Sequence, residues 1–117
     1  MSTRTQSAFN PLGLTIAIVA AAAPPLGVQA PSLGRVDNTP SGQYRIVNSG
    51  AVAVFLGYGK TAAAAQANAV APISDTPRQA IALLPGAIEV ISFGDGTFFS
   101  GRAASSVTLY ITPGVGL

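Results

Sequence analysis

Short apolar runs separated by turn-forming residues dominate the chain from residue 43 onward. The run QYRIVN alternates, with Tyr44 and Ile46 on one side and Arg45 and Val47 on the other, and residues 105–112 alternate in the same way. A period of two residues is typical of a β-strand, whose successive side chains point to opposite faces. No long helical period appears. We therefore expect an all-β fold, an antiparallel, jelly-roll-like β-sandwich of seven or eight short strands.

Turn residues mark the expected ends of these strands. The strands are expected at residues 14–19, 43–48, 51–58, 78–84, 87–93, 97–101 and 105–112. Asn48-Ser49-Gly50, with Gly50 able to take a positive φ, and Gly94-Asp95-Gly96 predict two hairpins. Pro85-Gly86 fits the central pair of a type II turn, and Pro113 is expected to end the last strand.

The chain is long enough for one domain, which we place at residues 12–117 behind a flexible polar arm at residues 1–11. Residues 60–72 form an alanine-rich segment within it. Thr61 could cap a short helix over residues 62–69, because alanine is the best helix former. A surface loop that orders against a neighbouring subunit is the alternative.

The apolar run at residues 14–23 permits two interpretations. With Arg4 before it and Val28-Gln29-Ala30 after it, the run has the outline of a secretory signal. It is about half of the ~20 residues needed to span a bilayer. We interpret residues 14–19 as a strand, expect no membrane contact, and keep export as an alternative.

Composition narrows the chemistry that the chain could perform. Charged residues make up 9% of it, there is no histidine or cysteine, and the net charge is +2. Zinc–thiolate sites and Ser–His–Asp triads are therefore excluded, and we expect no enzymatic activity, no metal and no cofactor. Residues 57–61 (GYGKT) end like a phosphate-binding loop, but Val54 stands where its first glycine belongs. The weak positive charge also disfavours specific nucleic-acid binding.

The surplus of apolar residues points to partners instead. Residues 51–58 are apolar on both faces, so one face should cover a core and the other should meet something else. Large exposed apolar patches mark protein–protein contacts, and we expect a homo-oligomer or a larger assembly. The candidate core or interface anchors, whose inward or outward direction the sequence leaves open, are Phe55, Leu56, Tyr58, Phe98 and Phe99.

Several segments resemble small structural proteins of tailed bacteriophages, some of which decorate or cement the capsid. They are YRIVNSG (44–50), VAVFLGYG (52–59), LPG (84–86), IEVI (88–91) and VTLYITPGVGL (107–117), so the resemblance covers roughly residues 43–117. It implies a jelly-roll protein on the capsid exterior of a virion, assembled in the host cytoplasm. Its partners would be the major capsid protein, whose subunits it would bridge, or other virion proteins, and no catalytic residues carry over.

Two other functions stay open at this point. One is a neck, connector or tail component of the same kind of particle. The other is an exported bacterial surface or adhesin subunit, with residues 14–23 as its signal.

Overall fold

The computed structural model describes residues 9–30, 41–71, 76–94 and 96–115. Over these ranges it contains nine strands and one short helix, which confirms the expected all-β class. The elements are β1 (Asn10–Pro11), β2 (Ile16–Ala20), β3 (Val28–Gln29), β4 (Ser41–Asn48), β5 (Val54–Gly59), α1 (Ala62–Asn68), β6 (Ala80–Leu83), β7 (Ile88–Gly94), β8 (Phe98–Ala103) and β9 (Val107–Val115).

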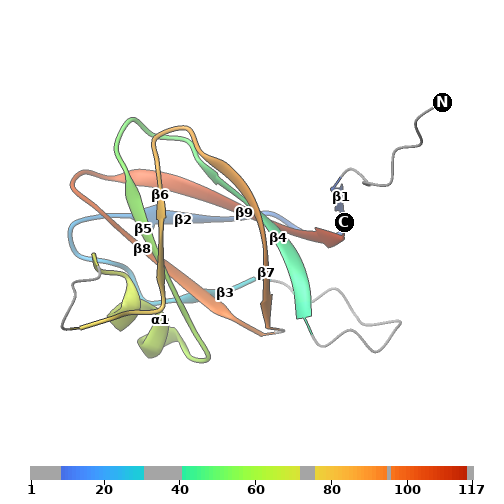
Figure 1. The fold of residues 1–117 in the computed structure, drawn as a ribbon, viewed down its shortest axis with the longest axis horizontal. Coiled ribbons are helices and arrows are strands. Elements are labelled where there is room, and N and C mark those ends of the chain that lie inside the picture. The colour runs from blue at the N-terminus through green and yellow to red at the C-terminus, as the bar shows by residue number, and fades with distance from the viewer. Residues whose placement is uncertain (1–8, 31–40, 72–75, 95, 116–117) are drawn as a thin grey trace.

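The strands form two antiparallel sheets that pack together (Figure 1). In the five-stranded sheet, β1 and β2 pair with the same edge of β9, which is followed by β4 and then β7. The four-stranded sheet has the order β3-β8-β5-β6. We refer to these as the five-stranded and the four-stranded sheet.

The strand pairing is that of a jelly roll. The chain from β2 to β5 pairs in reverse with the chain from β6 to β9, so that β2 meets β9, β3 meets β8, β4 meets β7 and β5 meets β6. This is the pattern of one long folded hairpin. Wrapping that hairpin into two layers adds the contacts of β4 with β9 and of β5 with β8. The eight strands β2–β9 therefore give the expected jelly-roll-like sandwich.

Alternate residues from both sheets fill the space between them. Ile46, Leu56, Leu109 and Ile111 are completely buried, as the two-residue period predicts. Four aromatic rings pack together within this core. Their contacting centroids are 5.0 to 5.9 Å apart, with tilted or edge-to-face packing, and the residues are Tyr44, Tyr58, Phe93 and Phe99.

The two hairpins expected from the sequence are wrong. The turn after Asn48 leads from β4 in one sheet to β5 in the other, and the turn that contains Gly96 leads from β7 to β8 in the same way. Gly50 does not have a positive φ, whereas Gly96 does, at 81°. Asp95 lies outside the described residues. A tight turn between two strands looks alike in sequence whether it joins neighbours in one sheet or crosses between two layers.

The expected turn at Pro85-Gly86 is confirmed, with φ of 74° at Gly86 and a hydrogen bond from the Ala87 N–H to the Leu84 carbonyl.

Gly86→Ala should destabilise the protein by about 1 kcal/mol, because a Cβ disfavours positive φ. A new Cβ there has no heavy atom within 4 Å, so the cost is that of the backbone alone. Urea unfolding followed by circular dichroism measures it, and an unchanged midpoint would contradict this explanation.

Pro113 does not end its strand, contrary to expectation, because β9 continues to Val115. The Pro113 carbonyl accepts hydrogen bonds from Leu12 and Gly13, so this residue directs its backbone toward the β1–β2 edge. The N and C=O of a strand residue point to the same side, and proline has no N–H to offer there. Pro113, which lacks this N–H, lies at the point on β9 between its pairing with β1 and its pairing with β2.

The N-terminal segment is part of the sandwich. Residues 14–19 were expected to form a strand, and β2 confirms this with Ile18 and Ala20 in the core. Residues 1–8 of the expected arm lie outside the described residues. Its last two residues are not an arm, since Asn10 and Pro11 pair with β9 as β1.

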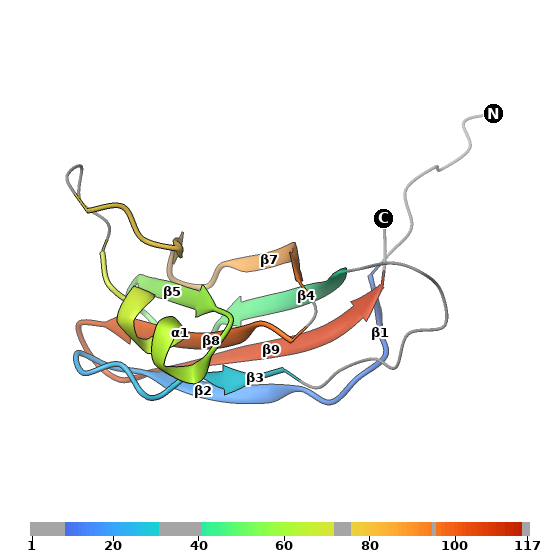
Figure 2. The same cartoon turned by 90° about the horizontal axis from the view of Figure 1, so that it is seen from below.

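The alanine-rich segment is the short helix α1, not a loop. Its first turn is capped as expected, with the Thr61 hydroxyl accepting a hydrogen bond from the Ala64 N–H at 3.0 Å. The helix lies outside the four-stranded sheet beside β5 and β8, far from β1 in both views (Figure 2). Gly57 and Gly59 make this possible, because a Cβ on either residue would collide with α1.

Candidate functional site: the outer face of the five-stranded sheet

The five anchors proposed from the sequence divide between the core and the outer side of the four-stranded sheet. Leu56 and Phe99 are completely buried, and Tyr58 packs its ring against Phe93. Leu56 and Phe99 are therefore core residues, which is one of the two roles that the sequence left open for them. Phe55 and Phe98 are half-buried on the outer side of the four-stranded sheet.

The second apolar face of β5 is covered by the chain itself. On this face Gly57 lies opposite Ser100 of β8, and α1 packs directly over Gly57. Ser100 is completely buried and donates its hydroxyl hydrogen bond to the Pro25 carbonyl. The sequence predicts that this face contacts something other than the core. In the structure, α1 and the segment around Pro25 of the same chain make that contact.

The outer face of the five-stranded sheet has no such cover in the described part of the chain. Strand register places one row of side chains straight across it, in the order Ala17, Tyr110, Val47 and Ile88. This row takes one residue from each of β2, β9, β4 and β7. We call the whole surface the outer face; it comprises Ala17, Val19, Gln43, Arg45, Val47, Ile88, Val90, Ser92, Thr108, Tyr110 and Thr112.

Large apolar side chains on the outer face are open to solvent. The exposed fraction is 53% for Val19, 57% for Ile88, 47% for Val90 and 43% for Tyr110. Single exposed apolar residues are ordinary, whereas a contiguous group of them usually marks an interaction surface. These four come from β2, β7 and β9, so the surface extends across the sheet.

The outer face ends in a hollow beside its charged residue. The hollow has a volume of about 350 Å³ and is lined by Phe9, Pro11, Thr15, Arg45 and Thr112. The hydroxyls of Thr15 and Thr112 share a hydrogen bond of 2.6 Å. Arg45 is exposed and forms no ion pair within the described ranges. The hollow therefore offers a guanidinium, hydroxyl groups and an aromatic ring, and a guanidinium is a good partner for a carboxylate.

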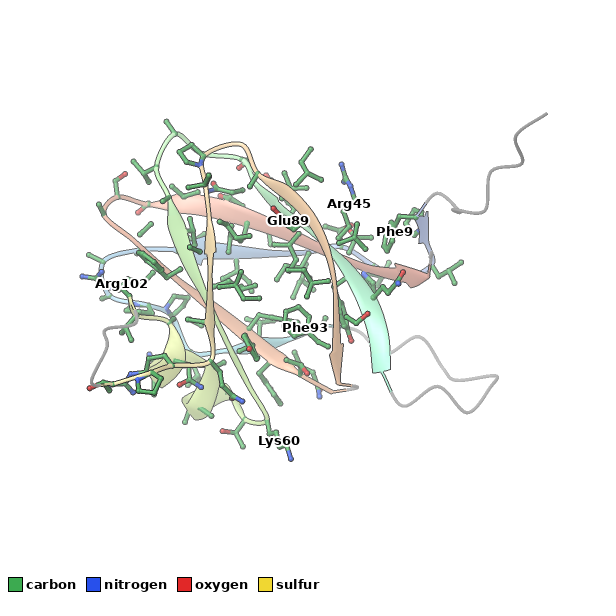
Figure 3. The ribbon with its side chains drawn as sticks, in the orientation of Figure 1. Phe9, Arg45, Lys60, Glu89, Phe93 and Arg102 are labelled. Carbon is green, nitrogen blue, oxygen red and sulfur yellow. The ribbon has the colours of Figure 1, made fainter. Side chains whose placement is uncertain are left out.

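The charged side chains of Lys60, Glu89 and Arg102 lie apart from one another (Figure 3). The sequence alone leaves open a pairing of Glu89 across a sheet with Arg102 or Arg78. Glu89 belongs to β7 in the five-stranded sheet and Arg102 to β8 in the four-stranded one, so the two are not cross-strand neighbours. Pairing of Glu89 with Arg102 across one sheet is therefore wrong. The other acids, Asp37, Asp75 and Asp95, lie outside the described residues.

The described residues bring together no group of three or more acids that could hold a metal ion. They also contain no helix long and apolar enough to cross a bilayer. Among the described residues, the site is a broad, largely apolar surface with one exposed cation, Arg45.

The outer face was partly visible in the sequence. The alternation in residues 105–112 separates Tyr110 from Leu109 and Ile111, and that in residues 87–93 places Ile88 and Val90 on one side. The sequence did not show that these two sets, with Ala17 and Val47, share one surface. That depends on the pairing of β9 with both β2 and β4.

Comparisons of the chain with protein-family models, with curated proteins and with solved structures find no match.

Proposed function

We propose that this protein is a non-enzymatic structural component of a tailed-bacteriophage virion, most simply a capsid cement protein that bridges major capsid subunits. The observation that carries the proposal is the outer face, an apolar surface that no described element of the chain covers. The segments that resemble phage structural proteins supply β4, β7 and β9, three of the strands that build this face.

The physical case rests on how such a surface behaves on a lattice. Exposed valine, isoleucine and tyrosine side chains gain about 25 cal/mol for each Å² of apolar surface that a partner removes from water. On a symmetric shell, each bound copy can contact more than one subunit, which raises the effective concentration of the next contact. Moderate contacts of this kind are enough to hold a small protein on a shell.

Arg45 would select the orientation in which a partner binds to this surface. It is the one charged side chain on the outer face among the described residues, and it lies between Thr112 on β9 and Val90 on β7. An acidic side chain of the capsid subunit could bind in the adjoining hollow, while the apolar row packs on the subunit surface. A charged contact at the rim selects orientation more than it adds affinity.

The position of β2 bears on the exported alternative. A signal cleaved after Ala30 would remove β2 and β3, together with the buried residues Ile18 and Ala20. The edge of β9 would then lose its partner strand. This favours retention of the segment in the working protein, and with it the virion proposal.

Tyr110→Lys should reduce binding to capsids that lack this protein by at least tenfold, because it places a charge in the middle of the apolar row. Tyr110 is exposed, so the fold should survive. Co-sedimentation with the capsids measures binding. Leu84→Lys is the matched control, because Leu84 is 68% exposed but lies at the turn between β6 and β7. Equal binding by both variants would remove the outer face from the proposal.

A further inference from the structure

Among the described strands, β7 is a long edge strand with no partner on its outer side. It ends the five-stranded sheet, and the described residues supply no strand beyond it. It has seven residues and no proline, whereas the other outermost strands are shorter: β2 has five residues, β6 has four and β3 has two. Although β6 and β7 follow each other in the chain, they lie in different sheets. Unshielded edges of this length are ready templates for another strand.

The register with β4 shows which backbone groups face this free edge. The Asn48 N–H donates to the Ala87 carbonyl at 2.9 Å, just beyond the pair Val47–Ile88. Hydrogen-bonded positions alternate along an antiparallel pair. Residues 87, 89, 91 and 93 therefore bond to β4, and Ile88, Val90 and Ser92 direct both their N–H and C=O groups outward.

We propose that β7 pairs antiparallel with β7 of a second copy of this chain, around a two-fold axis at Val90. In this register, Val90 lies opposite Val90 of the partner subunit, and Ile88 lies opposite Ser92 of the partner subunit. Each of the outward N–H and C=O groups on these three residues then finds a partner. The arrangement is isologous and closed, as in most homodimers.

Side chains favour a second copy as the occupant. Ile88 and Val90 are about half exposed on the outer face, and pairing would bring the two copies of this apolar pair together across the axis. Glu89, the one charge on β7, lies on the opposite side of the strand. It would face Ile91 of the partner subunit, so the register sets no like charges directly opposite each other.

The dimer would join two outer faces into one continuous apolar surface. It does not depend on the proposed virion role, because it rests on the β7 edge alone. If the dimer forms and capsid binding fails, the proposed function falls and the edge assignment remains.

Val90→Pro tests the pairing. Proline removes an N–H that points away from β4, and proline is tolerated in edge strands at such positions. By sedimentation equilibrium at millimolar concentration, the unchanged protein should have twice the chain mass, and Val90→Pro should have the mass of one chain. Val90→Thr, which keeps the N–H, should remain dimeric. A monomeric unchanged protein, or a dimeric Val90→Pro, would overturn the proposal.

Amide hydrogen exchange provides a readout that needs no variant, in case Val90→Pro does not fold. The amides of Ile88, Val90 and Ser92 should exchange quickly in dilute solution and become protected as concentration rises. The amides of Glu89 and Ile91, which bond to β4, should be protected throughout. A dimer whose Val90 amide still exchanges quickly would show that another surface forms the contact, and the β7 assignment would be wrong.

Discussion

Replacing Asn48 by aspartate is expected to lower the free energy of unfolding by about 4 kcal/mol, the cost of leaving a buried charge uncompensated. Asn48 is completely buried at the end of β4. Its side-chain amide donates to the carbonyls of Val52, Leu83 and Leu84 at 3.0 to 3.1 Å, and its Oδ1 accepts from the Gly50 N–H at 3.0 Å. One side chain thus ties together the connections β4–β5 and β6–β7, which both cross between the sheets.

An aspartate at this position would lose both amide donors and turn a carboxylate toward three carbonyl oxygens. Unpaired buried polar groups cost 1–3 kcal/mol each, and charged groups cost more. Urea unfolding followed by circular dichroism measures the change. Asn68→Asp is the graded control, because Asn68 is half-buried and donates one such hydrogen bond, to the Tyr58 carbonyl. It should cost about 1 kcal/mol, and equal losses at the two positions would contradict the role given to Asn48.

Gly57→Ala is expected to destabilise the protein by about 3 kcal/mol, near the upper end of what overpacking usually costs. A Cβ on Gly57 would lie 2.6 Å from the Ala65 carbonyl oxygen and would also collide with the Ala69 backbone nitrogen. These atoms belong to the backbone of α1 and its C-terminal cap, so no side chain can rotate away. The helix itself must move off the sheet.

The same substitution at Gly42 is the control for this effect. Gly42 lies in β4, and a Cβ there would meet no atom closer than 3.8 Å. Gly42→Ala should leave the unfolding midpoint nearly unchanged. In Gly57→Ala, the amide of Ala69 should also lose protection from hydrogen exchange, because it bonds within the α1 cap. A stable variant with α1 still protected would show that the close approach is not needed.

Local features of this fold were predictable from the sequence, because they depend on neighbouring residues. The alternation of Tyr44 and Ile46 against Arg45, the cap at Thr61 and the turn at Pro85-Gly86 all follow from local chemistry. Each involves residues within a few positions of one another. The all-β sandwich itself follows from the sum of such signals.

Strand pairing was not predictable in the same way. Ile18 pairs with Leu109, and Arg45 pairs with Thr112, across most of the chain. Tight turns such as the one after Asn48 were interpreted as hairpins, although the strands they join lie in different layers. The candidate site could not be predicted for the same reason, because the outer face forms only when β2, β9, β4 and β7 lie side by side.

The apolar surplus also proved to have two destinations. Part of it is covered by the chain itself, where α1 packs over Gly57 on the outer side of the four-stranded sheet. Another part lies on the outer face, where Val19, Ile88, Val90 and Tyr110 are exposed. Composition alone does not separate these two parts, whereas the fold shows which apolar residues are covered and which stay exposed.

A reconstruction of the native particle by electron cryomicroscopy tests the central claim most directly. The account predicts the protein at every equivalent position of the shell lattice, with Tyr110 and Val90 packed against a neighbouring subunit and Arg45 beside an acidic side chain. A ring of copies at a single vertex would instead assign the protein to the neck or tail. Absence from the particle, or an outer face turned to solvent, would contradict the account.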